Sequence, residues 1–137
     1  MAMRYFASQP LVRPVWAKLQ RDSSSAVTSW LGLLEHSADV AACFEATLAC
    51  ARPRLALARL AGLESLPQLW MDRLCVLAAL HDFGKANAGF QQRWAHKAPF
   101  VGHCREGLAA LLNETLRARL FAILPLTEIC GWGAFDG

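Results

Sequence analysis

Hydrophobic residues recur along most of the chain at intervals of three and four positions, which is the period of an amphipathic α-helix. The clearest run covers Leu33 to about Arg52, and Pro53 marks its expected end. Further helices are predicted over Arg54 to Leu63, Leu69 to Phe83, Asn87 to Trp94 and His103 to about Leu120. We find no segment that alternates between polar and apolar residues, and the pattern therefore predicts an all-α fold.

The first part of the chain lacks this periodicity. Residues 1–29 mix short apolar pieces with Pro10, Pro14 and three consecutive serines, which favours an irregular segment with one helical turn near Trp16 to Leu19. Residues 30–137 are then expected to form the folded part. With 137 residues, of which 55% are hydrophobic and 18% charged, the chain can bury the core of one domain without disulfides or a structural metal.

Composition excludes several classes of protein. The five cysteines contain no C-x-x-C pair, so we expect neither a disulfide framework nor a zinc ribbon, but buried small side chains in a reducing compartment. No apolar run approaches the roughly 20 residues of a membrane span, and the N-terminus lacks a secretory signal, which indicates a cytoplasmic protein. The net charge of +3 is mild, and arginines scattered over helices are usually solvated, so charge alone does not identify a nucleic-acid partner.

The segment richest in possible chemistry lies where the expected helix over Leu69 to Phe83 ends. That helix is almost wholly apolar and is expected to be central and buried, with Gly84 at the position of a left-handed cap. His81 and Asp82 lie at its C-terminal end, where unsatisfied carbonyl groups favour a cation. A divalent metal is the expected occupant.

The residue types around this point suit a metal that acts on a phosphate. A neutral imidazole from His81 suits manganese, iron, cobalt, nickel or zinc, and the two oxygens of Asp82 can bridge two ions. Lys85 follows close enough to reach a phosphate oxygen held by the metal. His36 and His103 stand at the starts of two other predicted helices, so three helix ends could converge on one site. The alternative is a polar helix end, with these histidines in surface or core roles.

Two stretches of the chain resemble a known family. Glu35 to Ala41, and Leu77 to Gln91 with its run Gly-Lys-x-x-x-x-Phe-Gln after His-Asp, look like the HD nuclease domain of the type I CRISPR-associated nuclease-helicase. The order and spacing of these motifs agree with that family over most of residues 30–120. The resemblance implies a helical HD-domain bundle that cleaves single-stranded DNA with metal-activated water.

The resemblance also implies roles for individual residues. The metal ligands would be His36, His81, Asp82 and His103, and the catalytic residues Asp82 and Lys85. The metal would be divalent Mg, Mn, Ni, Co or Fe, and the partners single-stranded DNA, the CRISPR surveillance complex and a helicase domain or subunit. His96 fits no ligand position and is read as a surface histidine. No G-x-x-x-x-G-K-[ST] loop occurs, so ATP hydrolysis is not assigned to this chain.

The sequence departs from the family towards its end. The family adds a His-His pair inside Gly-His-His-Gly and a later Asp, whereas this chain reads Ile129-Cys130-Gly131-Trp132-Gly133. We therefore expect a truncated, partial HD domain over residues 30–137, which either stops before the pair or has Trp132 in its place, so that a second ion lacks ligands. The apolar stripe of the last helix, continued by Phe121, Ile123, Leu124 and Leu126, is then expected to lack a cover and to promote dimerisation or aggregation.

Two other functions fit the same residues. One is an HD-type nucleotide phosphohydrolase, which would have a compact anion pocket and would be insensitive to long DNA. The other is a non-catalytic HD remnant that keeps the fold and binds the CRISPR complex or its helicase partner.

Overall fold

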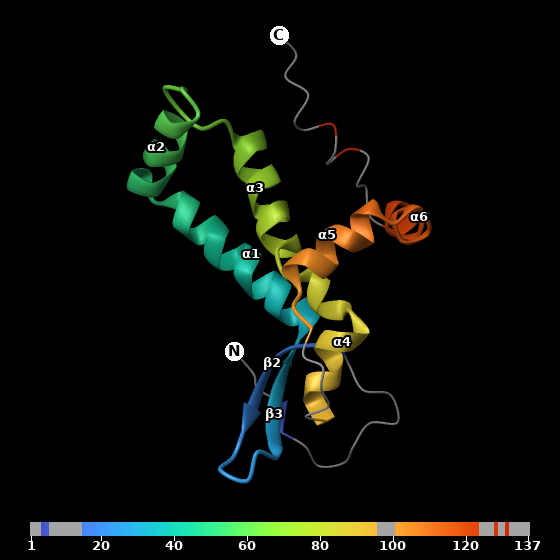
Figure 1. Cartoon of the computed structure of the whole chain (residues 1–137). Coiled ribbons are helices and arrows are strands. Elements are labelled where there is room, and N and C mark those ends of the chain that lie inside the picture. The colour runs from blue at the N-terminus through green and yellow to red at the C-terminus, as the bar shows by residue number, and fades with distance from the viewer. Residues whose placement is uncertain (1–3, 6–14, 96–100, 124–127, 129–130, 132–137) are drawn as a thin grey trace.

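The computed structural model describes residues 4–5, 15–95, 101–123, 128 and 131 (Figure 1). Helices form most of it, which confirms the predicted helical fold class. The helices are α1 (Leu33–Ala49), α2 (Ala51–Leu60), α3 (Gln68–Leu80), α4 (Ala88–Gln91), α5 (Cys104–Leu112) and α6 (Glu114–Ile123), with the short 3₁₀ helices η1 (Phe83–Ala86) and η2 (Gln92–Ala95). The strands are β1 (Arg4–Tyr5), β2 (Trp16–Arg21) and β3 (Val27–Gly32). The predictions for His96, Leu124, Leu126 and Trp132 lie outside the described residues.

A three-stranded antiparallel sheet lies at the N-terminal end, where we predicted irregular backbone. Its central strand is β3, in which Trp30 faces Leu19 of β2 and Ser29 faces Tyr5 of β1. The predicted helical turn over Trp16 to Leu19 is wrong, because these residues begin β2. The sheet is thus a small addition to a helical fold.

The strands were missed because their hydropathy pattern is hidden. One of the two buried positions on β3 is taken by Ser29, which is 1% exposed and whose hydroxyl donates to Gln20 Oε1 at 3.0 Å. A polar residue at a buried position removes the alternation by which a strand is recognised. On β2, the register shifts between Trp16 and Lys18, which interrupts the two-residue period as well.

The helices α1 and α3 form an antiparallel pair above the sheet. The first turn of α1 follows β3 directly, and α3 returns alongside α1, so that the end of α3 lies next to that first turn (Figure 1). α1 ends at Ala49 and not at Pro53. Pro53 lies instead in the first turn of α2, where its missing N–H has little cost because donors there have no partner within the helix.

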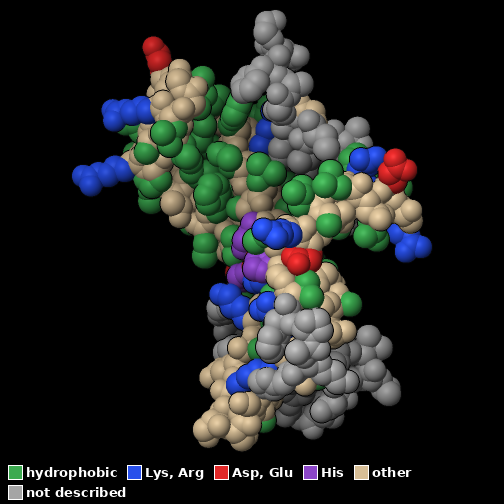
Figure 2. Space-filling view, viewed as in Figure 1, with side chains coloured by type: hydrophobic (Ala, Val, Ile, Leu, Met, Phe, Trp, Pro, Cys, Tyr) green, Lys and Arg blue, Asp and Glu red, His purple; other side chains and the backbone are tan. Residues whose placement is uncertain are grey.

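The helix α3 is apolar but not buried, contrary to our prediction. None of its residues is buried, and Val76 and Leu77 are 40% and 48% exposed, because the main neighbour of α3 is α1 alone. Figure 2 shows the apolar surface that results over α1, α2 and α3. The prediction of a left-handed Gly84 is also wrong: Gly84 lies within η1, and among the glycines that the structure describes the positive φ belongs to Gly62, at 70° after α2.

The last predicted helix is divided into α5 and α6. The division lies at Asn113, whose side-chain Oδ1 accepts a hydrogen bond from the backbone N–H of Leu116 at 3.0 Å and thereby caps α6. Leu108, Leu112 and Leu116 are 58%, 70% and 46% exposed. These three exposed leucines, two on α5 and one on α6, are together called the α5–α6 apolar face.

We expect the α5–α6 apolar face to make the purified chain self-associate as its concentration rises. Burying one leucine contributes about 1.5–3 kcal/mol, so Leu112→Glu should weaken association by about tenfold or more in sedimentation velocity. The control is Ala118→Glu, which adds the same charge two positions after Leu116, on the opposite side of α6. A wild-type chain that stays monomeric at high concentration would contradict the prediction.

The buried apolar core lies mainly where the sheet, α1 and α4 meet. Its members there are Trp16, Ala17, Leu31, Leu33 and Phe90. This core therefore supports the first turn of α1 and the segment that follows α3. Among the residues that the structure describes, no helix has both the length and the apolar character needed to cross a lipid bilayer.

Candidate metal centre

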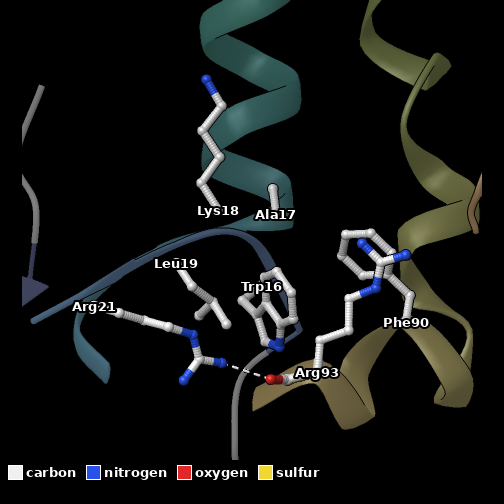
Figure 3. A pocket seen from close by; sticks show the side chains of 7 residues that line it. All are labelled: Trp16, Ala17, Lys18, Leu19, Arg21, Phe90 and Arg93. Atoms are coloured by element: carbon white, nitrogen blue, oxygen red, sulfur yellow. Dashed lines mark hydrogen bonds between the residues drawn. The ribbon is translucent and has the colours of Figure 1, made fainter. Parts of the chain in front are cut away.

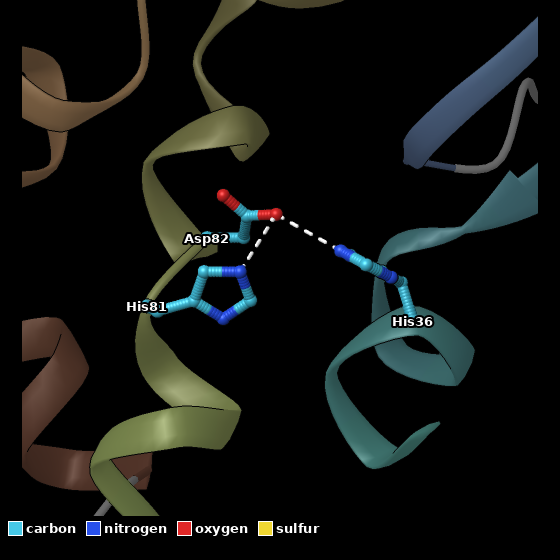
Figure 4. Close-up of side chains that lie close together, drawn as sticks. All are labelled: His36, His81 and Asp82. Atoms are coloured by element: carbon cyan, nitrogen blue, oxygen red, sulfur yellow. Dashed lines mark hydrogen bonds and ion pairs between the residues drawn. The ribbon is translucent and has the colours of Figure 1, made fainter. Parts of the chain in front are cut away.

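Three histidines surround the carboxylate of Asp82. His36 Nε2 lies 3.0 Å and His81 Nε2 3.1 Å from Asp82 Oδ2 (Figure 4), and His103 Nε2 lies 3.2 Å from Asp82 Oδ1. The structure thus brings together the three helix ends named from the sequence. His36 and Asp82 are buried, whereas the side chains of His81 and His103 are 43% and 32% exposed, so the cluster is open on one side.

Each of these side chains is placed by the end of a helix. His36 lies in the first turn of α1, which starts directly after the central strand of the sheet. His81 and Asp82 follow the last residue of α3, and Asp82 directly precedes η1. His103 precedes α5, and its carbonyl oxygen accepts the first bond of that helix, from Gly107 N at 3.0 Å. Rigid helices therefore fix the backbone of the whole cluster.

The orientation of the His81 ring favours a cation beside it. His81 Nδ1 lies 2.7 Å from the carbonyl oxygen of Ala78. A carbonyl oxygen can only accept, so Nδ1 carries the proton, and in the neutral ring Nε2 presents a lone pair. His81 Nε2 lies 3.1 Å from Asp82 Oδ2. At this distance the lone pair of the nitrogen and the negatively charged oxygen repel each other. The contact becomes favourable when a proton or a metal ion lies between them.

The carboxylate of Asp82 is held in its charged form by its neighbours. Burial raises the pKa of Asp82, but the hydrogen bond and the charge of Lys85, the charge of His81 and the hydrogen bond of His36 together outweigh it, so that the pKa is lowered. Lys85 Nζ lies 2.5 Å from Asp82 Oδ2, and its side chain is only 11% exposed. The buried negative charge is thus surrounded by groups that stabilise it.

The lowered pKa of Asp82 predicts a pH dependence of stability in the metal-free protein. The unfolded pKa is about 3.9, and the folded value lies below it, so the unfolded chain binds more protons in that range and stability increases with pH. The free energy of unfolding, measured with urea in EDTA, should therefore fall as pH drops below about 4. Asp82→Asn should flatten this fall, whereas Asp39→Asn, at an exposed site on α1, should not. Equal slopes for the two variants would contradict the prediction.

Gln91, at the end of the Gly-Lys-x-x-x-x-Phe-Gln run, ties the sheet to this cluster. Its Oε1 accepts from the backbone N–H of Trp16 at 3.2 Å, and its Nε2 donates to the carbonyl oxygens of Trp16 at 2.9 Å and Lys85 at 2.7 Å. Gln91 thus binds the edge of β2 as a neighbouring strand would, and holds the backbone next to Asp82. The sequence contained the run but gave this glutamine no role.

Phe90 and Asn87 from the same run complete the support. The Phe90 ring is 5.6 Å from the His103 ring and 4.8 Å from Trp16, and is 4% exposed. Asn87 Nδ2 donates to the carbonyl oxygens of Gly84 at 2.7 Å and Gly102 at 3.0 Å, and Asn87 Oδ1 accepts from Phe90 N. These contacts connect the segment before His103 to the segment after Asp82.

The donor set fits one divalent metal ion. The imidazole nitrogens of His36 and His81 face Asp82 Oδ2 at 3.0 and 3.1 Å, whereas His103 Nε2 faces the other oxygen, Oδ1, at 3.2 Å. Ligand atoms of His36, His81 and Asp82 all lie within 4.8 Å of one another. Imidazole nitrogens with a carboxylate suit manganese, iron, cobalt, nickel or zinc better than magnesium.

Comparison with known proteins gives one match. The family model described as "Cas3, HD domain" matches residues 16–119, a range that includes β2, β3, the three histidines of the cluster, Asp82 and Lys85. A search of curated proteins and a search of solved structures found no match. Because the model covers well over half of the sequence, the chain belongs to the family of Cas3 HD domains, the metal-dependent nuclease domains of CRISPR systems.

Proposed function

We propose that this chain binds a divalent metal ion through His36, His81, Asp82 and His103 and hydrolyses phosphodiester bonds of single-stranded DNA in type I CRISPR defence. The observation that carries the proposal is the position of His81. Its Nδ1 proton is engaged by Ala78, and its Nε2 faces the Asp82 carboxylate at 3.1 Å, an arrangement that a cation between the two atoms stabilises.

The chemistry follows from the residues around that position. A divalent ion, when bound, lowers the pKa of a water molecule and polarises a phosphoryl oxygen. Asp82 supplies the negative charge that holds the cation, and the hydrogen bond from His81 Nδ1 to Ala78 keeps the imidazole oriented. Lys85 contacts the same carboxylate through a flexible side chain, and its ammonium group would interact with the anionic oxygens of the phosphate.

The substrate would reach the cluster from its open side. His36 and Asp82 are buried, so the exposed rings of His81 and His103 define where a phosphodiester enters. We propose single-stranded DNA as the polymer, because the family acts in CRISPR defence on DNA. The CRISPR surveillance complex and a helicase are the proposed partners, and the cytoplasm is the proposed compartment.

The proposal is tested with circular single-stranded DNA, which only an endonucleolytic cut can open. The purified chain is incubated with the DNA and manganese, nickel or magnesium, and in parallel with EDTA, while calorimetry measures metal binding separately. We expect metal binding and degradation with manganese or nickel, and no degradation in EDTA. Metal binding without cleavage would favour the non-catalytic remnant, and hydrolysis of nucleotides but not of DNA would favour the phosphohydrolase.

A further inference from the structure

The backbone directly before His103 is held by side chains of α4 and η2. Asn87, the N-cap of α4, donates from Nδ2 to the carbonyl oxygen of Gly102 at 3.0 Å. Arg93 donates from a guanidinium NH2 to the carbonyl oxygen of Val101 at 2.7 Å. The segment that leads to His103 is part of no helix or strand, so these two bonds fix its path.

Packing supports the same segment. The Arg93 guanidinium lies beside the Phe90 ring, with its carbon 4.6 Å from the ring centre (Figure 3). The Phe90 ring in turn lies 5.6 Å from the His103 ring. A Cβ on Gly89 would collide with the Val101 side chain, so this glycine leaves the space that the valine occupies. The short helices α4 and η2 thus form a support for the residues that lead to His103.

Asn87 performs two tasks through two different atoms. Its Oδ1 accepts from the backbone N–H of Phe90 at 2.8 Å and so caps α4. Its Nδ2 donates to the carbonyl oxygens of Gly84 at 2.7 Å and Gly102 at 3.0 Å, and so joins η1 to the residue before His103. Because the tasks use different atoms, one substitution can remove the second task and keep the first.

The position of His103 is determined from both sides of its backbone. On the α5 side, its carbonyl oxygen accepts from Gly107 N at 3.0 Å. On the other side, Asn87 holds the preceding residue, Gly102. The His103 side chain makes no capping bond of its own, and its Nε2 faces Asp82 Oδ1 at 3.2 Å. A shift of the Gly102 backbone would therefore change the distance between His103 and the carboxylate.

We propose that Asn87 is a positioning residue for His103, which it keeps next to Asp82 through the bond from its Nδ2 to Gly102. A residue of this kind orients a metal ligand without touching the ion, and its loss weakens metal binding about 10- to 100-fold. That His103 is a metal ligand rests on the proposed function. The hydrogen bonds by which Asn87 holds it do not depend on the metal.

The substitution Asn87→Asp separates the two tasks of this side chain. Aspartate caps a helix as well as asparagine does, so α4 keeps its cap, but Nδ2 is replaced by an oxygen that cannot donate. The carbonyl oxygens of Gly84 and Gly102 then face a carboxylate, which repels them. The added negative charge by itself would strengthen the binding of a cation. A weaker metal affinity in this variant therefore reports a displaced ligand and not the change of charge.

Calorimetric titration of the full chain with manganese measures the effect. We expect Asn87→Asp to weaken the affinity about tenfold, at the lower end of the range, because the bond to Gly102 is exposed. His103→Ala should weaken it at least as much. The double variant should bind manganese within about twofold of His103→Ala, since a residue that acts only through His103 then has nothing left to position.

The matched control is Asn113→Asp, the same change at the start of α6. Asn113 Oδ1 accepts from the backbone N–H of Leu116 as Asn87 Oδ1 does from Phe90, but its Nδ2 donates to no described residue. The nine residues of α5 separate it from His103 by about 14 Å, so its charge is screened from the cluster. Its manganese affinity should stay within about twofold of that of the wild type.

Three results would overturn the positioning role. They are a manganese affinity of Asn87→Asp equal to or tighter than that of the wild type, an equal loss in Asn113→Asp, and additive losses from Asn87→Asp and His103→Ala. Additive losses would mean that Asn87 acts through Gly84 and not through His103.

Hydrogen exchange decides the positioning role without any metal. In EDTA, the Gly107 N–H, which donates to the His103 carbonyl oxygen, should exchange about tenfold faster in Asn87→Asp than in the wild type. Unchanged exchange would overturn the proposal. A wild-type chain that binds no manganese would refute the proposed function, whereas faster exchange of Gly107 in the variant would still support the role of Asn87.

Discussion

Replacing Asp82 with asparagine is expected to reduce metal-dependent DNA cleavage by about 1,000-fold or more. Three histidines and Lys85 all contact this one carboxylate, so it is the only negative charge that the described cluster offers to a cation. Removing a group that merely supports a metal ligand costs about 10- to 100-fold, and the loss of the central ligand should cost more. The asparagine side chain keeps the size of the aspartate, so the change acts through charge.

Cleavage and metal affinity should fall together in this variant. Calorimetric titration with manganese measures the affinity, gel analysis of circular single-stranded DNA measures the rate, and circular dichroism checks that the helices persist. Asp39→Asn is the matched control, since it removes an exposed carboxylate from α1 outside the cluster and should retain both properties. Cleavage by Asp82→Asn within tenfold of the wild-type rate would refute the central role of this carboxylate.

The helices and the convergence of the histidines were predictable because both depend on local patterns. The 3.6-residue period identifies α1 and α3 from their own residues, and a helix end fixes the position of a side chain next to it. His36, His81 and His103 each stand at such an end. Placing three helix ends together required only that the helices pack as an antiparallel group, which short connections favour.

The contacts of β2 with the segment from α4 to η2 could not be predicted because they depend on the sheet. Without a strand over residues 16–21, Arg21 was expected to lie in an irregular segment. Arg21 meets the carbonyl oxygen of Arg93 across a separation of 72 residues, and neither residue shows this partnership in its local sequence. Because the buried Ser29 interrupts the apolar pattern of β3, the sequence did not predict the sheet that brings Arg21 and Arg93 together.

Gly84 was identified from the sequence as a residue that has to be glycine, but for the wrong physical reason. The sequence places a glycine after an apolar helix, which predicts a left-handed cap. In the structure the reason is the close approach of α5: a Cβ on Gly84 would lie 1.9 Å from the His103 carbonyl oxygen and 2.9 Å from Gly107 N. Close approach between segments about twenty residues apart is a tertiary property, and no local pattern contains it.

Replacing Gly84 with alanine is therefore expected to damage both stability and the metal site. The added methyl group meets backbone atoms of His103 and Gly107, which cannot rotate away as a side chain can. Overpacking of this kind costs about 3 kcal/mol where the backbone has to move. The movement carries His103 with it, so the 3.2 Å separation between His103 Nε2 and Asp82 Oδ1 should be lost.

The facing glycine provides a graded comparison for this prediction. A Cβ on Gly107 would lie 3.3 Å from the Gly84 Cα and 3.4 Å from the Phe83 ring, a tight contact that small shifts can relieve. Gly107→Ala should then lower the melting temperature and the manganese affinity much less than Gly84→Ala, as differential scanning fluorimetry and calorimetry can measure. If the two variants lose stability equally, the difference in helix propensity between glycine and alanine, and not the contact with the His103 backbone, explains the loss. If Gly84→Ala unfolds less readily than Gly107→Ala, the approach of α5 to η1 does not position His103.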